Sequence, residues 1–107
     1  MENPKYTKAI SELAKDGTTI MKVFGNSMTP LIQSGSTLTF QRCDKYEIGD
    51  IVFCRCNGRF VDAHKITSQN DKRGYLISNN HGHDNGWTHR IFGKVVRIEL
   101  KAKNEDI

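Results

Sequence analysis

The sequence predicts a mainly β fold: a small, coiled antiparallel sheet or partly open barrel with one N-terminal α-helix. Short runs rich in β-branched and aromatic residues alternate with turn-forming pairs from about residue 18 to residue 100. Only residues 4–16 carry apolar side chains at helical spacing. A chain of 107 residues has room for one domain, residues 1–107, with a thin and mostly aliphatic core.

The expected helix has a start signal and a stop signal. Asn3 can cap its first turn, Pro4 suits the first helical position, and Gly17 ends it. Its apolar side chains form one face that can dock on the sheet, and they are Tyr6, Ile10, Leu13 and Ala14.

Six short strands are expected after the helix. They are Thr18–Phe24, Ser36–Cys43, Ile51–Cys56, Arg59–Ser68, Gly74–Ser78 and Gly93–Lys101. Asn57-Gly58 gives the sharpest turn signal, because Asn-Gly accepts the positive φ angles of a type I′ hairpin. Asn85-Gly86 is likewise assigned to a turn, and residues 101–107 are expected to fray.

Composition excludes several classes of protein. No apolar stretch approaches the length of a membrane span or of a signal-peptide core, so we expect a cytoplasmic protein without a membrane anchor. Three cysteines, Cys43, Cys54 and Cys56, make a poor disulfide framework and fit reduced thiols. The formal net charge of +4 is spread along the chain without aromatic interleaving, so nucleic acid is not the expected partner.

Residues 24–35 place Ser27 in a tight turn between a strand and an apolar half-turn. Gly25 lets the backbone bend, so the Ser27 hydroxyl can project as a nucleophile while nearby backbone N–H groups face a developing oxyanion. A serine in such a turn can instead bond only to its local backbone.

The same run resembles the Gly-x-Ser-Met-x-Pro-x-x-x-x-Gly signature of the LexA-like and signal-peptidase-like serine peptidases. Gly25, Ser27, Met28, Pro30 and Gly35 all match it. Three later segments resemble the same superfamily in the same order: Ile48–Val52, Val61–Ile66 and Ile91–Val96. The resemblance covers about residues 18–100 and implies the fold of those peptidases.

The resemblance implies that His64 is the general base. The common family motif has a lysine base, whereas the tetrapeptide here is Ala63-His64-Lys65-Ile66, as in the Ser-His signal peptidases. Strand alternation sets His64 and Lys65 on opposite faces, so only one can reach Ser27. A half-buried histidine without a catalytic role is the alternative interpretation.

The resemblance also assigns three supporting residues. Asp84 corresponds to the aspartate that would orient His64, although it can equally be a solvated loop residue. Met28 and Pro30 would contact substrate, and Met28 can equally fill the core. His81, His83 and Asp84 are weak evidence for a metal, so we expect neither a metal nor a cofactor.

Two functions follow from these expectations. The first is hydrolysis of a peptide bond in a peptide or protein substrate through a Ser-His pair. Self-cleavage in the LexA manner is not expected, because no Ala-Gly or Cys-Gly dipeptide precedes Ser27. The second is a stand-alone, catalytically weak or inactive module of phage or mobile-element type that binds a protein partner. Edge strands of such a sheet can pair two copies, so a homodimer is compatible with both.

Overall fold

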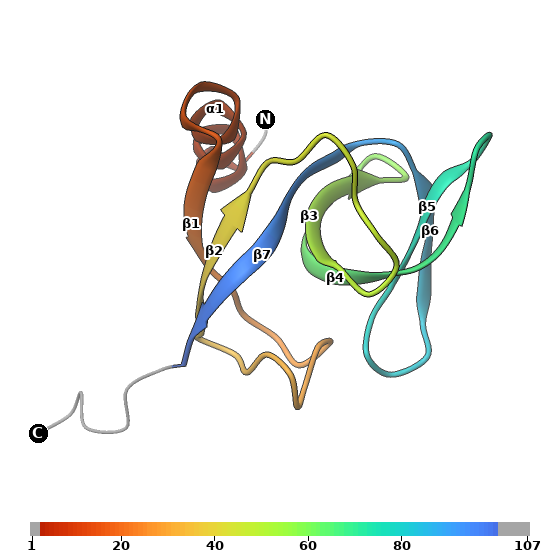
Figure 1. The fold of residues 1–107 in the computed structure, drawn as a ribbon. Helices are drawn as coiled ribbons and strands as arrows, with labels where there is room; N and C mark the ends of the chain where they lie inside the picture. Colours follow the sequence, from red (N-terminus) through yellow and green to blue (C-terminus); the bar gives the residue numbers. More distant parts are fainter. Residues whose placement is uncertain (1–2, 101–107) are drawn as a thin grey trace, which may run out of the picture.

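The structure of the protein is a computed structural model, and it is described for residues 3–100. One helix and seven strands follow each other along the chain (Figure 1): α1 (Pro4–Asp16), β1 (Thr18–Lys22), β2 (Thr37–Gln41), β3 (Ile51–Cys56), β4 (Arg59–Asn70), β5 (Gly74–Ser78), β6 (Asp84–Thr88) and β7 (Ile91–Glu99). The predicted mainly β fold with an N-terminal helix is confirmed. The tail that was expected to fray lies outside the described residues.

All the strands belong to one antiparallel sheet in the order β1-β2-β7-β3-β4-β5-β6. The last strand, β7, returns to lie between β2 and β3, where it joins the first part of the sheet to the strongly curved second part (Figure 1). Register shifts occur in five of the six strand pairs that form this sheet. Such bulges bend and twist strands, which accounts for the coiling.

Helix α1 is capped as its sequence predicts. The Asn3 side chain accepts a hydrogen bond from the backbone N–H of Lys5, and Gly17 has a φ of 78° and donates its N–H to the carbonyl of Leu13. Ala9 and Leu13 are the buried residues of the helix, and they anchor it against the first part of the sheet.

Two apolar clusters form the core. The first lies under α1 and consists of Ala9, Leu13, Met21, Val23, Met28, Ile32, Leu38, Phe40, Phe53 and Ala63. The second lies within the curved part of the sheet and consists of Tyr46, Val52, Cys54, Cys56, Val61, Ile66 and Ile77. Met28 and Ile32 belong to the loop between β1 and β2, so the first cluster fixes the loop that carries Ser27.

The expected Asn57-Gly58 hairpin is confirmed, since the two residues have φ angles of 53° and 77° and connect β3 to β4. Other strand boundaries differ from expectation by a few residues. The assignment of Asn85-Gly86 to a turn is wrong, because both residues lie within β6. Gly86 still needs to be glycine, since its φ is 134° and an added Cβ would lie 2.7 Å from Asn57 Nδ2. Its turn-like sequence therefore reflects a bulged strand packed against the hairpin.

Within residues 3–100, no helix combines the length and the apolar character that crossing a membrane requires.

Candidate active site

Ser27 lies on the loop between β1 and β2, which we call the serine loop (residues 23–36). Backbone hydrogen bonds close the base of this loop: Val23 N–H donates to Ser36 O at 2.9 Å and Gly35 N–H to Val23 O at 2.7 Å. Gly25 at its start and Gly35 at its end have φ angles of 100° and 89°, which side-chain-bearing residues rarely adopt. The loop turns tightly between them and leaves Ser27 half-buried at its inner side.

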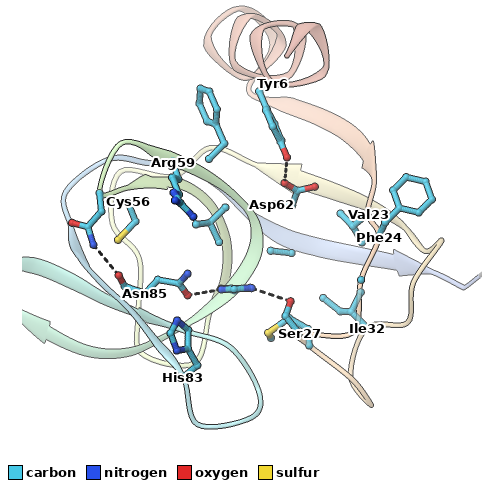
Figure 2. Close-up of a pocket in the computed structure, with 17 residues that line it drawn as sticks. Tyr6, Val23, Phe24, Ser27, Ile32, Cys56, Arg59, Asp62, His83 and Asn85 are labelled. Carbon is cyan, nitrogen blue, oxygen red and sulfur yellow. Dashed lines mark hydrogen bonds between the residues drawn. The ribbon is translucent and has the colours of Figure 1, made fainter. Parts of the chain in front are cut away.

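His64 projects from β4 toward this loop. Its Nε2 atom lies 2.9 Å from Ser27 Oγ, within hydrogen-bond distance (Figure 2). The residue is half-buried and pairs with Val52 of β3, so a central strand of the sheet fixes its backbone. The structure therefore brings together the serine and the histidine that the sequence singled out.

The other nitrogen of the His64 ring has a partner that the sequence did not suggest. Nδ1 lies 2.6 Å from Oδ1 of Asn85 on β6 (Figure 2). With this oxygen as acceptor, Nδ1 carries the ring proton and Nε2 is free to accept the hydrogen of the Ser27 hydroxyl. Asn57 of the β3–β4 hairpin donates from Nδ2 to the carbonyl of Asn85 at 2.9 Å, which holds the Asn85 backbone in place.

Asp84, which was expected to orient His64, has a different partner. Its Oδ1 accepts a hydrogen bond from Ser78 Oγ at 2.7 Å, and the residue is exposed. The cause is a bulge between β5 and β6: Ser78 pairs with Asp84 and Ile77 with Gly86, so Asn85 is an extra residue on β6. An extra residue breaks the alternation of the strand, and Asn85 rather than its neighbour contacts the imidazole.

The environment of His64 favours the neutral imidazole. Burial is the largest influence and lowers the pKa of His64 below its ordinary value, and His83 lowers it further. The hydrogen bond to Asn85 and the charge of Asp62 act in the opposite direction without reversing the shift. A neutral imidazole can accept a proton, so the ring is prepared to act as a base near neutral pH.

A cavity of about 680 Å³ opens beside Ser27 and His64. The serine loop forms one wall, β4 forms the other, and the first turn of α1 lies at one end (Figure 2). Much of its lining is apolar, from Val23, Met28, Ile32, Val61 and Ala63. The expected substrate residue Met28 is thus both buried and part of the cavity wall, whereas Pro30 is exposed and does not line the cavity.

A polar cluster occupies the helical end of the cavity. Asp62 accepts a hydrogen bond from Tyr6 Oη (Figure 2). It accepts a second one from Lys5 Nζ at 2.8 Å. Burial and the neighbouring carboxylate raise the pKa of Tyr6, so its hydroxyl stays protonated and donates. Helix α1 therefore contributes directly to the cavity. The sequence did not indicate this, because the helix is separated from Ser27 along the chain.

Lys65, the other basic residue of the expected base motif, has a hydrogen-bond partner other than Ser27. Its Nζ donates to Oδ1 of Asn80 at 3.0 Å. The expectation that only one of His64 and Lys65 contacts the serine agrees with these contacts. The alternation behind that expectation is irregular, because β4 is bulged opposite Val52–Cys54 and Ile66 is buried along with Val61 and Ala63.

The remaining histidines and cysteines have separate surroundings. His81 contacts Asn26 and Thr29, His83 lines the cavity, and His89 contacts the carbonyl of Lys72. Among residues 3–100, no three histidine, cysteine or acidic side chains come together as a metal site. Cys54 is buried, and burial raises its pKa to about 12, so its thiol is unreactive.

One comparison with known proteins gives a match. The family model described as Peptidase S24-like covers residues 2–98, almost the whole chain. No curated protein matches the sequence.

Proposed function

Because the chain belongs to the Peptidase S24-like family, we propose that it hydrolyses peptide bonds, with Ser27 as nucleophile and His64 as general base. The observation that carries this proposal is the distance of 2.9 Å between Ser27 Oγ and His64 Nε2 at the wall of a peptide-sized cavity. Hydrogen-bond contact between a hydroxyl nucleophile and a base is the first requirement of this chemistry.

The proposed reaction has two stages. Ser27 Oγ attacks the carbonyl carbon of the substrate while His64 Nε2 takes the hydroxyl proton. The C–N bond then breaks, and His64 returns that proton to the departing amine, which leaves an acyl ester on Ser27. A water molecule attacks the ester, His64 accepts a proton from the water, and that proton passes to Ser27 Oγ as the acid product leaves.

Backbone amides are the proposed stabilisers of the oxyanion. Within the described part of the chain, the N–H groups of Ser27 and Met28 donate to no other group. Both belong to the segment that carries the nucleophile, on a loop held at its base, and are therefore the proposed donors to the oxyanion.

Asn85 is the proposed orienting residue in place of Asp84. A neutral amide can fix the ring tautomer through Nδ1, as asparagine does in Cys-His-Asn peptidases, but it stabilises the imidazolium less than a carboxylate does. We therefore expect slow turnover. The negative charge of Asp62 raises the pKa of His64, and so it compensates in part for the weaker stabilisation of the imidazolium by Asn85.

An extended peptide fits the geometry beside β4. β5 pairs with β4 only from Lys65 onward, so residues 59–64 have β3 on one side and no strand on the other among the described residues. That open side borders the cavity. A substrate can add to it as a strand, with main-chain hydrogen bonds giving affinity and the apolar wall selecting side chains.

The proposed substrate is a separate chain rather than the protein's own N-terminal region. Residues from Pro4 to Lys22 are engaged in α1 and in β1, which pairs with β2 along its length. A bond in either element would have to leave its hydrogen-bonded partners before it could enter the cavity in an extended form.

A peptide-binding module that does not cut is the second candidate. The observation that favours it is the neutral Asn85 at the position where a triad would have a carboxylate. Such a module would use the same open side of β4 and the same apolar wall.

Incubation with a library of extended peptides separates the two candidates. The proposed function predicts new product termini, detected by mass spectrometry, that disappear with Ser27→Ala and persist with Ser11→Ala, a matched change on the exposed face of α1. Peptides that bind without being cut, equally to wild type and Ser27→Ala, would favour the binding module and overturn the proposal.

A further inference from the structure

The turn between β5 and β6 bonds to the serine loop through several contacts. We call residues 79–83 the asparagine turn. Asn79 organises it internally: its Oδ1 accepts from the N–H groups of His81 at 2.8 Å and His83 at 2.9 Å, and its own N–H donates to the carbonyl of His83 at 2.9 Å. The turn is therefore a rigid unit rather than a loose loop.

Asn80 makes the central contacts from this turn to the serine loop. Its backbone N–H donates to the carbonyl of Ser27 at 2.8 Å. Its side-chain Nδ2 donates to the carbonyl of Thr29 at 2.9 Å. One residue thus binds the Ser27–Met28 and Thr29–Pro30 peptide units, and the first of these carries the Met28 N–H proposed for the oxyanion.

Lys65 fixes which way the Asn80 amide faces. Its ammonium donates to Asn80 Oδ1 at 3.0 Å, so the oxygen faces Lys65 and the NH₂ group faces Thr29. Lys65 follows His64 on β4, and the same strand therefore positions the base directly and the nucleophile indirectly.

His81 adds a contact on the other side of Ser27. Its Nε2 lies 3.0 Å from the carbonyl of Asn26 and 3.1 Å from Thr29 Oγ1. The carbonyls of Asn26, Ser27 and Thr29 are thus each bonded to the asparagine turn, although the serine loop has no strand partner at these residues.

From these contacts we propose that Asn80, oriented by Lys65, is a positioning residue that holds Ser27 Oγ at hydrogen-bond distance from His64. The proposal rests on the proposed function for its effect on rate, but the restraint on the loop is a separate property. Small displacements of a reacting group cost large factors in rate, about a hundredfold for 1 Å. A restraint at the Ser27 and Thr29 carbonyls therefore matters more to reactivity than to stability.

Asn80→Asp tests the proposal with a minimal change. It keeps an oxygen facing Lys65 and replaces the donor to the Thr29 carbonyl by a second oxygen. The first readout is hydrogen exchange, monitored by NMR, at the backbone amide of residue 80 and at the loop amides of Thr29 and Ile32. The second is the rate at which a peptidyl p-nitrophenyl ester acylates Ser27 with release of p-nitrophenol, measured over a range of pH.

We expect faster exchange at these amides and acylation slower by about tenfold to a hundredfold. Acylation is compared on the high-pH plateau of each profile, because the added carboxylate itself raises the pKa of His64. Asn70→Asp is the matched control: Asn70 Oδ1 also accepts from a turn, from Lys72 N–H at 2.8 Å and Arg73 N–H at 3.0 Å, and aspartate keeps that acceptor. It should leave exchange in the serine loop and acylation unchanged.

Lys65→Met provides a second variant in case Asn80→Asp does not fold, with the exposed Lys72→Met as its control. It should also slow acylation and speed exchange in the serine loop, by smaller factors. Wild-type exchange and acylation in a folded Asn80→Asp or Lys65→Met protein would overturn the proposal. If the wild type is not acylated at all, the proposed function fails, and the exchange measurement alone decides whether Asn80 restrains the loop.

Discussion

Asn85 Oδ1 lies 2.6 Å from His64 Nδ1, and the bulge that brings it there makes Asn85 the extra residue of β6. The neighbouring carboxylate of Asp84 contacts Ser78 instead. The His64 ring is consequently oriented by a neutral group. This arrangement distinguishes the site from one in which a carboxylate orients the histidine.

Replacing Asn85 by aspartate should strengthen the base. A carboxylate at this position would stabilise the imidazolium, so the pKa of His64 should rise and acylation of Ser27 at pH 8 should be faster by about tenfold. NMR titration of the His64 ring and the pH profile of acylation check both effects, with Asn70→Asp as control. An unchanged pKa and rate would contradict the orienting role of Asn85.

The lowered pKa of His64 also predicts how stability depends on pH. Folding disfavours the imidazolium, so the folded protein binds fewer protons than the unfolded chain between the folded pKa and about 6.5. This contribution to the free energy of unfolding is complete above about pH 6.5 and is lost as the pH falls toward the folded pKa. Urea titrations at several pH values should show this slope in wild type and its loss in His64→Gln. If the free energy of unfolding changes with pH in the same way in both proteins, the contribution of His64 is contradicted.

Gly86→Ala should damage both stability and the site. A φ of 134° and an added Cβ at 2.7 Å from Asn57 Nδ2 make alanine strained there, at a cost of about 1–3 kcal/mol. Displacing Asn57 also removes its hydrogen bond to the Asn85 carbonyl, so acylation should slow. Gly17→Ala is the matched control, because Gly17 has a φ of 78° with open space around it and lies at the end of α1 away from the cavity. It should cost stability without slowing acylation, and equal slowing in both variants would contradict the role of Gly86.

Met28→Ala should change which peptides bind. Met28 is buried and lines the cavity, so its truncation enlarges the cavity at its apolar wall. The loss of buried side-chain atoms should lower the free energy of unfolding by about 2–5 kcal/mol. Peptides with larger apolar side chains should be cleaved more efficiently relative to peptides with small ones, measured as the ratio of their kcat/KM values. Met21→Ala provides the comparison, since Met21 is also a buried methionine but does not line the cavity. The same shift of preference in both variants would contradict this assignment of the cavity.

Local sequence signals predicted the helix, the hairpin at Asn57-Gly58 and the positions of Ser27 and His64. Each depends on neighbours in the chain: a cap and a glycine stop, an Asn-Gly turn, or a spaced motif. Asn85 could not be found in this way, because its role follows from a bulge that only the pairing of β5 with β6 creates. The contacts of Asn80 and of Tyr6 likewise join segments that are more than fifty residues apart in the sequence.

Whether Ser27 and His64 act together is best tested by treating the protein with a fluorophosphonate at neutral pH, followed by intact-mass and peptide-mapping analysis. We expect one added phosphonyl group on Ser27 in the wild type and none in Ser27→Ala. In a folded His64→Gln protein, labelling of Ser27 should be slower by about a hundredfold or more. No label on Ser27, or labelling of Ser27 that is equally fast without His64, would contradict the proposal that these two residues act together.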